Sequence, residues 1–168
     1  MLIYSTKYGS TAEYAGALAR ELGIRAFRTN EPFEITGNEP YYILGSPIYA
    51  FSVLPAMEDF IEEQKEMLLA RPLAVFVVCG DTMWNPRKGE GGWKNLRKLT
   101  RLLPKEPFAS AVFGGRMRME ELDEVDGPRI LSFYKQLGRE ATGFDRMEIE
   151  RVPQFAAEIR QKLPSASG

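Results

Sequence analysis

Apolar residues along the chain fall into short continuous runs, separated by longer stretches in which they recur at helical spacing. The continuous runs predict strands at residues 1–4, 24–28, 41–46, 73–79 and 108–113. Two of these runs, 41–46 and 73–79, are almost wholly apolar, which is typical of strands that helices cover on both faces. The alternation of strand and helix predicts an open α/β fold with a parallel sheet, which binds its ligands at the carboxyl ends of the strands.

Five stretches carry apolar residues at helical spacing. They cover residues 12–22, 54–68, 93–103, 129–137 and 152–163. Gly23 ends the first of them, and Pro153 suits the start of the last. Between the second and third strands, residues 29–40 contain two prolines and a glycine, which predicts an irregular connection.

The 168 residues suffice for one domain, which we place at residues 1–163, with 164–168 as a flexible tail. Histidine is absent, and Cys79 is the single cysteine. These counts exclude Ser-His-Asp and Cys-His catalysis, histidine-ligated metals, an internal disulfide and a thiolate zinc site. We therefore assign no catalytic residue and no metal site. The protein must act through a cofactor, use carboxylates, or only bind.

The net charge of −1 conceals a strong segregation of charge along the chain. Between residues 84 and 118 there are nine basic and two acidic residues, so this stretch carries +7 and the remainder −8. The basic residues are Arg87, Lys88, Lys94, Arg97, Lys98, Arg101, Lys105, Arg116 and Arg118. They can bind substrate carboxylates, anionic lipid headgroups or an acidic redox protein, or they form a solvated helix face paired with acidic residues of a neighbouring helix. Nucleic acid is not expected, because no recognition motif accompanies them.

The chain shows neither a membrane span nor a secretion signal. Its apolar runs are much shorter than the roughly 18 residues of a span. Residues 1–5 lead directly into a glycine-containing loop, without the charged start, long apolar core and cleavage site of a signal peptide. We therefore expect a cytoplasmic protein.

The loop between the first strand and the first helix has the chemistry of a phosphate site. It consists of Thr6, Lys7, Tyr8, Gly9, Ser10 and Thr11. Amides at a helix N-terminus bind anions, Gly9 permits close backbone approach, and three hydroxyls add hydrogen bonds. The loop is neither a Walker sequence nor a Gly-x-Gly-x-x-Gly fingerprint. The alternative is a Ser/Thr cap on an ordinary helix.

Residues 2–18, LIYSTKYGSTAEYAGAL, resemble the FMN phosphate signature of the flavodoxins. The resemblance implies an FMN cofactor whose phosphate is held by residues 6–11. It also implies a flavodoxin-like sheet with the strand order 2-1-3-4-5 and helices on both faces. Tyr8 stands where flavodoxins usually carry a third hydroxyl residue, so one phosphate contact is expected either to be lost or to be supplied by the Tyr8 amide alone.

Two further loops are implied to enclose the isoalloxazine ring. The first contains Pro47, Ile48, Tyr49, Ala50 and Phe51, and the second contains Gly80, Asp81, Thr82 and Trp84. Tyr49 and Trp84 offer flat aromatic faces for stacking on the ring. The alternative for Trp84 is a place over the hydrophobic core, and Asp81 is expected to be a turn or cap residue rather than a base.

The first of these loops contains no glycine. Flavodoxins commonly carry one there, and its peptide flips to stabilise the one-electron reduced flavin. A turn with positive φ costs more without glycine. We therefore expect a bias toward two-electron chemistry.

The region from 114 to 151 is longer than an electron-carrying flavodoxin needs. It holds an acidic run and the predicted helix 129–137, whose apolar face we assign to Ile130, Leu131, Tyr134 and Leu137. This length is more similar to the flavodoxin-like branch that includes quinone-dependent protoporphyrinogen dehydrogenase. That branch implies oxidation of a large apolar anion with electrons passed to a quinone.

Three functions therefore stay open on the sequence. They are an electron carrier for a redox partner protein, a quinone-linked or porphyrinogen-linked oxidoreductase, and a non-catalytic flavin-binding module. Peripheral membrane contact through the basic stretch 87–118 and a homo-oligomer are further expectations.

Overall fold

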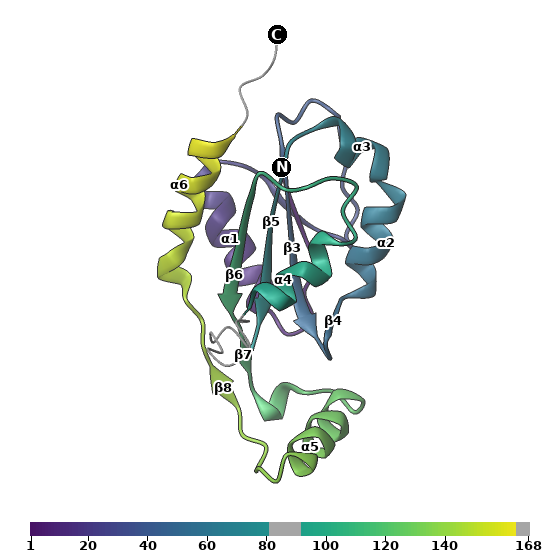
Figure 1. Cartoon of the computed structure of the whole chain (residues 1–168), viewed down its shortest axis with the longest axis vertical. Coiled ribbons are helices and arrows are strands. Elements are labelled where there is room, and N and C mark those ends of the chain that lie inside the picture. The colour runs from purple at the N-terminus through teal and green to yellow at the C-terminus, as the bar shows by residue number, and fades with distance from the viewer. Residues whose placement is uncertain (81–91, 164–168) are drawn as a thin grey trace.

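Five parallel strands form the centre of the protein in the computed structural model, which describes residues 1–80 and 92–163 (Figure 1). They are β1 (Leu2–Tyr4), β2 (Ala26–Arg28), β3 (Tyr42–Tyr49), β5 (Leu73–Cys79) and β6 (Ala109–Gly114). Their order across the sheet is β2-β1-β3-β5-β6, which confirms the predicted order 2-1-3-4-5 of the five main strands. The additional strand β4 (Ser52–Val53) pairs antiparallel with the end of β3.

Helices cover both faces of this sheet, as the continuous apolar runs predict. On one face lie α1 (Ser10–Leu22) and α6 (Val152–Lys162), and on the other lie α2 (Pro55–Glu63), α3 (Lys65–Ala70) and α4 (Trp93–Thr100) (Figure 1). Successive β3 residues alternate between the two faces, so Ile43 joins the core beneath α1 and Leu44 the core beneath α2. All seven residues of β5 are buried.

The predicted helix 54–68 is divided in two. Gln64 leaves the helical region with φ −105° and ψ 19°, so α2 ends there and α3 begins at Lys65. The second helix buries Leu68 completely against the same core as Met57 and Ile61 of the first. No glycine or proline marks this position in the sequence, and the spacing alone therefore predicts one helix.

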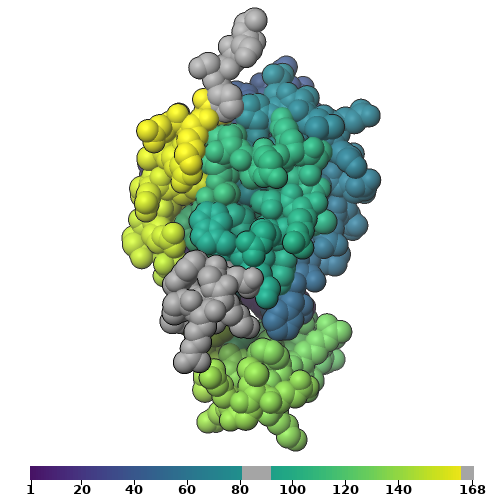
Figure 2. All heavy atoms as spheres, in the orientation of Figure 1, coloured from purple at the N-terminus to yellow at the C-terminus, as the bar shows by residue number. Residues whose placement is uncertain are grey.

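Residues 116–145 form a lobe at the carboxyl end of the sheet. The lobe contains β7 (Arg116–Met117), the short 3-10 turn η1 (Met119–Glu121), α5 (Asp126–Gln136) and β8 (Phe144–Asp145). β7 and β8 pair antiparallel at its base, and a second 3-10 turn, η2 (Ile149–Arg151), leads into α6. In Figure 2 the lobe, in light green, projects from one end of the body.

The lobe corrects one sequence assignment. Leu131 is 54% exposed and does not belong to the inward face of α5, where Phe133 stands instead. Asp126 is the residue of α5 that is fully buried.

None of the helices within residues 1–80 and 92–163 combines the length and the apolar character that a membrane span requires.

The turn between β3 and β4 adopts an unusual backbone for its sequence. Tyr49 pairs with Ser52, and the two residues between them, Ala50 and Phe51, have φ values of 46° and 68°. Two positive φ values are the geometry of a tight hairpin turn that normally uses Asn-Gly or Gly-Gly. The left-handed region costs other residues about 1–2 kcal/mol each, so this turn is strained.

Replacing Ala50 with glycine is expected to relieve that strain. We expect Ala50→Gly to raise the free energy of unfolding by about 1 kcal/mol in urea titrations. The control Ala17→Gly, inside α1, is expected to lower it by about 1 kcal/mol, because glycine there loses more backbone entropy. A loss of stability in both variants would contradict the left-handed turn.

Candidate functional site

The loop that connects β1 to α1 is held in place by its own backbone and by neighbouring strands. Gly9, at the N-cap of α1, has φ 93°, and a Cβ at this residue would meet no atom within 4 Å. Glycine is therefore needed here for its conformation and not for space. The Gly9 amide donates to Thr6 Oγ1 at 3.2 Å, and Arg28 Nη2 donates to the Thr6 carbonyl at 3.0 Å. We call residues 6–11 the phosphate loop.

Thr11 carries the least satisfied polar atom of this loop. Its side chain is in the first turn of α1 and the residue is 1% exposed, yet its Oγ1 has no hydrogen-bond partner among the described residues. A buried hydroxyl without a partner is destabilising, typically by about 1–3 kcal/mol. The backbone amides of Lys7 and Tyr8 likewise donate to no group of the part of the chain described. These unsatisfied donors all belong to the phosphate loop at the start of α1, where an anionic ligand could accept from them.

A cavity of about 470 Å³ opens in front of the loop, at the carboxyl end of the sheet. This is the size of a small-molecule site. The predicted residues that line it are Thr6, Lys7, Tyr8, Ser10, Thr11, Pro47, Ile48, Tyr49, Ala50, Phe51 and Gly80. The fold therefore brings the phosphate loop and the first ring loop to one cavity. Asp81, Thr82 and Trp84 lie outside the described residues.

A second hollow, of about 570 Å³, follows the outer edge of β6 and α6. None of the predicted site residues lines it. Two of its lining residues, Glu148 and Arg151, form an ion pair at 3.0 Å. The unpartnered Thr11 hydroxyl belongs to the first cavity, which we take as the candidate site.

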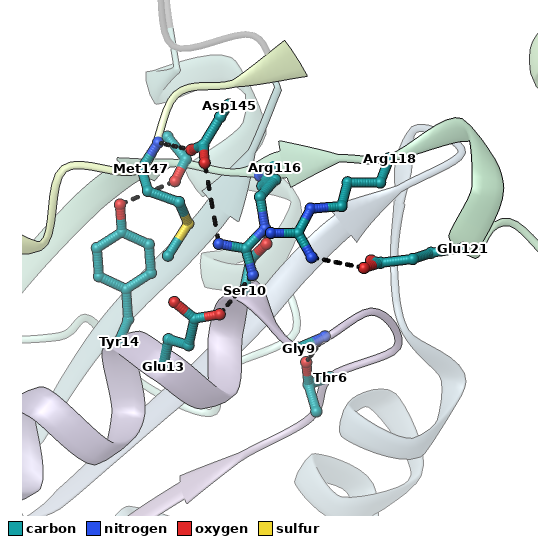
Figure 3. Close-up of polar contacts among 11 residues, drawn as sticks. Thr6, Gly9, Ser10, Glu13, Tyr14, Arg116, Arg118, Glu121, Asp145 and Met147 are labelled. Carbon is teal, nitrogen blue, oxygen red and sulfur yellow. Dashed lines mark hydrogen bonds and ion pairs between the residues drawn. The ribbon is translucent and has the colours of Figure 1, made fainter. Parts of the chain in front are cut away.

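Helix α1 is tied to Arg116 at the base of the lobe and to the segments just before and just after the lobe (Figure 3). The Arg116 amide donates to Ser10 Oγ at 3.2 Å, and its guanidinium pairs with Glu13 at 2.5 Å. Tyr14 Oη donates to the Gly114 carbonyl at 2.9 Å and accepts from the Glu148 amide. Burial raises the pKa of Tyr14 to about 12, so its hydroxyl remains protonated as a donor near neutral pH.

The side chains of Lys7 and Tyr8 contact the far end of the lobe. Tyr8 Oη donates to Asp126 Oδ2 at 2.5 Å, and Lys7 Nζ pairs with the same oxygen and with Asp123 Oδ2, the latter at 3.0 Å. Burial alone would raise the pKa of Asp126, but the hydrogen bonds from Lys7 and Tyr8 hold it below its usual range. The Lys7 and Tyr8 side chains are thus engaged with the lobe, and both residues also line the cavity.

Tyr49 lies against the same group. Its ring centroid is 5.6 Å from that of Tyr8, and Lys7 Nζ is 5.2 Å from it. The Tyr49 hydroxyl is buried near Tyr8 and Asp126 without a hydrogen bond of adequate geometry to either, and burial raises its pKa. Tyr49 is therefore held at the wall of the cavity.

The lobe forms the wall of the cavity that faces the phosphate loop and residues 47–51. The sequence did not predict that the lobe contributes to the site. The apolar members of this wall are Met117, Leu122, Ile130, Phe133, Leu137 and Phe144. Arg116, Arg118 and Arg139 of the lobe and Arg146 directly after it also line the cavity, with Arg116 and Arg118 paired to carboxylates. The helical spacing of α5 predicted an apolar face, but nothing in the sequence indicated that this face lines a cavity with the phosphate loop.

Solved structures share the architecture described above. Flavodoxin 1 from Bacillus cereus has 16% identity and a TM-score of 0.56, with 97% of each chain covered. A Fusobacterium nucleatum flavodoxin bound to flavin mononucleotide has 14% identity and a TM-score of 0.56, again over 97% of each chain. A variant of the flavo di-iron protein from Thermotoga maritima has 13% identity and a TM-score of 0.55, over 97% of this chain and 35% of that one. At such identities these likenesses establish the fold alone.

The sequence itself gives the family. No curated protein sequence matches the chain significantly. A profile described as the Flavodoxin domain matches residues 1–140, which include the phosphate loop, both ring loops and α5. Since this match spans most of the chain, the protein belongs to the flavodoxin domain family.

Proposed function

We propose that this protein binds FMN and transfers electrons through it. The observation that carries the proposal is the Thr11 hydroxyl, which is buried at the first turn of α1 and lacks a partner. A hydroxyl placed there, beside the amides of a helix N-terminus, suits a phosphate group. Membership of the flavodoxin domain family supports this ligand, as does the Fusobacterium nucleatum flavodoxin with its flavin mononucleotide.

Different residues of the cavity would contact the phosphate and the ring of the cofactor. The hydroxyls of Thr6, Ser10 and Thr11 and the amides of the phosphate loop would hold the phosphate. The ring would lie against residues 47–51 and the loop that starts at Gly80, where the sequence predicts contributions from Asp81, Thr82 and Trp84. Bound FMN supplies the redox chemistry, while the protein orients it and sets the polarity around it.

The phosphate would be attracted without a dedicated cation in the loop. Lys7 is paired with Asp123 and Asp126, so its charge is already balanced by two carboxylates. Attraction then comes from the positive end of α1 and from directed hydrogen bonds. Substituting a hydroxyl of the loop therefore tests the proposal more directly than substituting Lys7.

The test substitution is Thr11→Val, which keeps the shape of the side chain and removes the hydroxyl. Because that hydroxyl has no partner within residues 1–80 and 92–163, we expect the cofactor-free variant to be at least as stable as the wild type. We expect its Kd for FMN, from quenching of flavin fluorescence, to rise at least about tenfold.

Thr100→Val is the matched control. Thr100 ends α4, away from the residues that line the cavity, so the affinity for FMN should not change. Wild-type affinity in Thr11→Val would contradict the phosphate assignment. The absence of FMN binding by the wild-type protein would contradict the proposed function itself.

A second candidate is two-electron oxidation of a large apolar anion, with a quinone as acceptor, as in the protoporphyrinogen dehydrogenase branch. The observation that favours it is the wall formed by α5, where Phe133 and Leu137 line the cavity yet are 39% and 52% exposed. Arg139 lines the same cavity, and it forms no ion pair within the ranges 1–80 and 92–163. An apolar wall beside an available guanidinium suits a planar anion.

The second candidate is tested with two quinones that differ in charge. We expect the reduced, FMN-loaded protein to be reoxidised faster by naphthoquinone sulfonate than by neutral naphthoquinone. Arg139→Gln should lower the rate with the sulfonate about fivefold and leave the neutral rate unchanged, since Arg139 is exposed and its charge partly screened.

Arg129→Gln serves as the control, because Arg129 is an exposed residue of the same helix that does not line the cavity. Equal rates for the two quinones in the wild type would exclude an anion site at Arg139. The electron-carrier function would then be the better account.

A further inference from the structure

The lobe meets the body at two separate places. At its base, backbone hydrogen bonds hold the two ends of the lobe to the sheet. The Gly115 amide donates to the Cys79 carbonyl at 3.0 Å, and the Arg146 amide donates to the Gly115 carbonyl at 3.0 Å. At its far end, α5 meets the phosphate loop and the β3–β4 turn. The turn contact is one edge-to-face pair, Phe51 with Phe133, at a centroid distance of 5.7 Å. Phe51 is 70% exposed, so this pair is a weak attachment.

The stronger attachment at the far end is polar and converges on one carboxylate. The Asp126 side chain is 3% exposed, and its Oδ2 accepts from both Lys7 and Tyr8 of the phosphate loop. A buried carboxylate depends on such partners, because water no longer solvates it. Separating α5 from the loop would therefore break both contacts and expose the charge at once.

Asp123 joins the start of α5 to the same loop. Its Oδ1 accepts from the amides of Val125 and Asp126, at 3.0 and 2.7 Å, which fixes the first turn of α5. Its Oδ2 pairs with Lys7 at 3.0 Å, and its amide donates to Tyr8 Oη at 3.3 Å. The two aspartates thus direct the beginning of α5 onto Lys7 and Tyr8.

From this geometry we infer that Asp126 is the positioning residue of a latch, which holds α5 over the cofactor cavity and slows cofactor exchange. We call the contacts of Asp123 and Asp126 with Lys7 and Tyr8 the latch. The inference rests on the proposed function for the identity of the cofactor. The cavity lies between the phosphate loop, residues 47–51 and α5, so a molecule held there is enclosed in part by α5. Opening the latch widens the exit, while the hydroxyls of Thr6, Ser10 and Thr11 take no part in the latch contacts.

The latch itself is tested without any ligand. We expect Asp126→Asn to speed amide hydrogen exchange about tenfold in peptides from 119–137 of the cofactor-free protein. Exchange in β3 and β5 should stay at the wild-type level, which shows that the variant is folded. Glu124→Gln, at an exposed acidic residue of the lobe, is the control and should exchange like the wild type. Unchanged exchange at 119–137 in Asp126→Asn would overturn the latch.

Gating is tested by cofactor release. We expect FMN to dissociate about tenfold faster from Asp126→Asn than from the wild type, with Glu124→Gln unchanged. Lys7→Met should give a similar rate, and combining it with Asp126→Asn should add little, because both remove one interaction. Equal release rates in all variants would overturn gating. If the wild type bound no FMN, the proposed function would fail, while hydrogen exchange would still decide whether the latch exists.

Discussion

The parallel pairing of β1 with β3 is the constraint on which the candidate site depends. Leu2, Ile3 and Tyr4 pair with Ile43, Leu44 and Gly45, so both strands end at the same edge of the sheet. Directly after β1, the Ser5 hydroxyl donates to the Ser46 hydroxyl of β3 at 3.2 Å. The phosphate loop and the first ring loop must therefore emerge side by side. Their meeting at one cavity follows from this register.

The same edge of the sheet has two features that lower the stability of the fold. Thr11 buries a hydroxyl without a partner, and the turn after β3 holds Ala50 and Phe51 in the left-handed region. Both features cost folding free energy, and both line the cavity. Opposite them, α5 leaves apolar side chains half exposed. A ligand that pairs the hydroxyl and covers those side chains would stabilise the protein.

Local pattern predicted the elements of the body and little of the lobe. Continuous apolar runs gave the five main strands, but spacing carries no information on strand order, which came from the likeness of residues 2–18 to flavodoxins. The tight turn at Ala50 could not be predicted, because it contains no glycine. The contact of Lys7 with Asp126 joins residues 119 positions apart and leaves no local signal. The helical spacing of α5 likewise did not show that Phe133, and not Leu131, lines the cavity.

Recognition of a phosphate by residues 6–11 is the property on which the proposed function depends most directly. The decisive measurement compares the Kd of the cofactor-free protein for FMN with its Kd for riboflavin, which has the same ring and no phosphate. Several hydrogen bonds to a charged group are involved, so FMN is predicted to bind at least about 100-fold more tightly. Equal affinities for the two flavins would contradict the assignment of the loop.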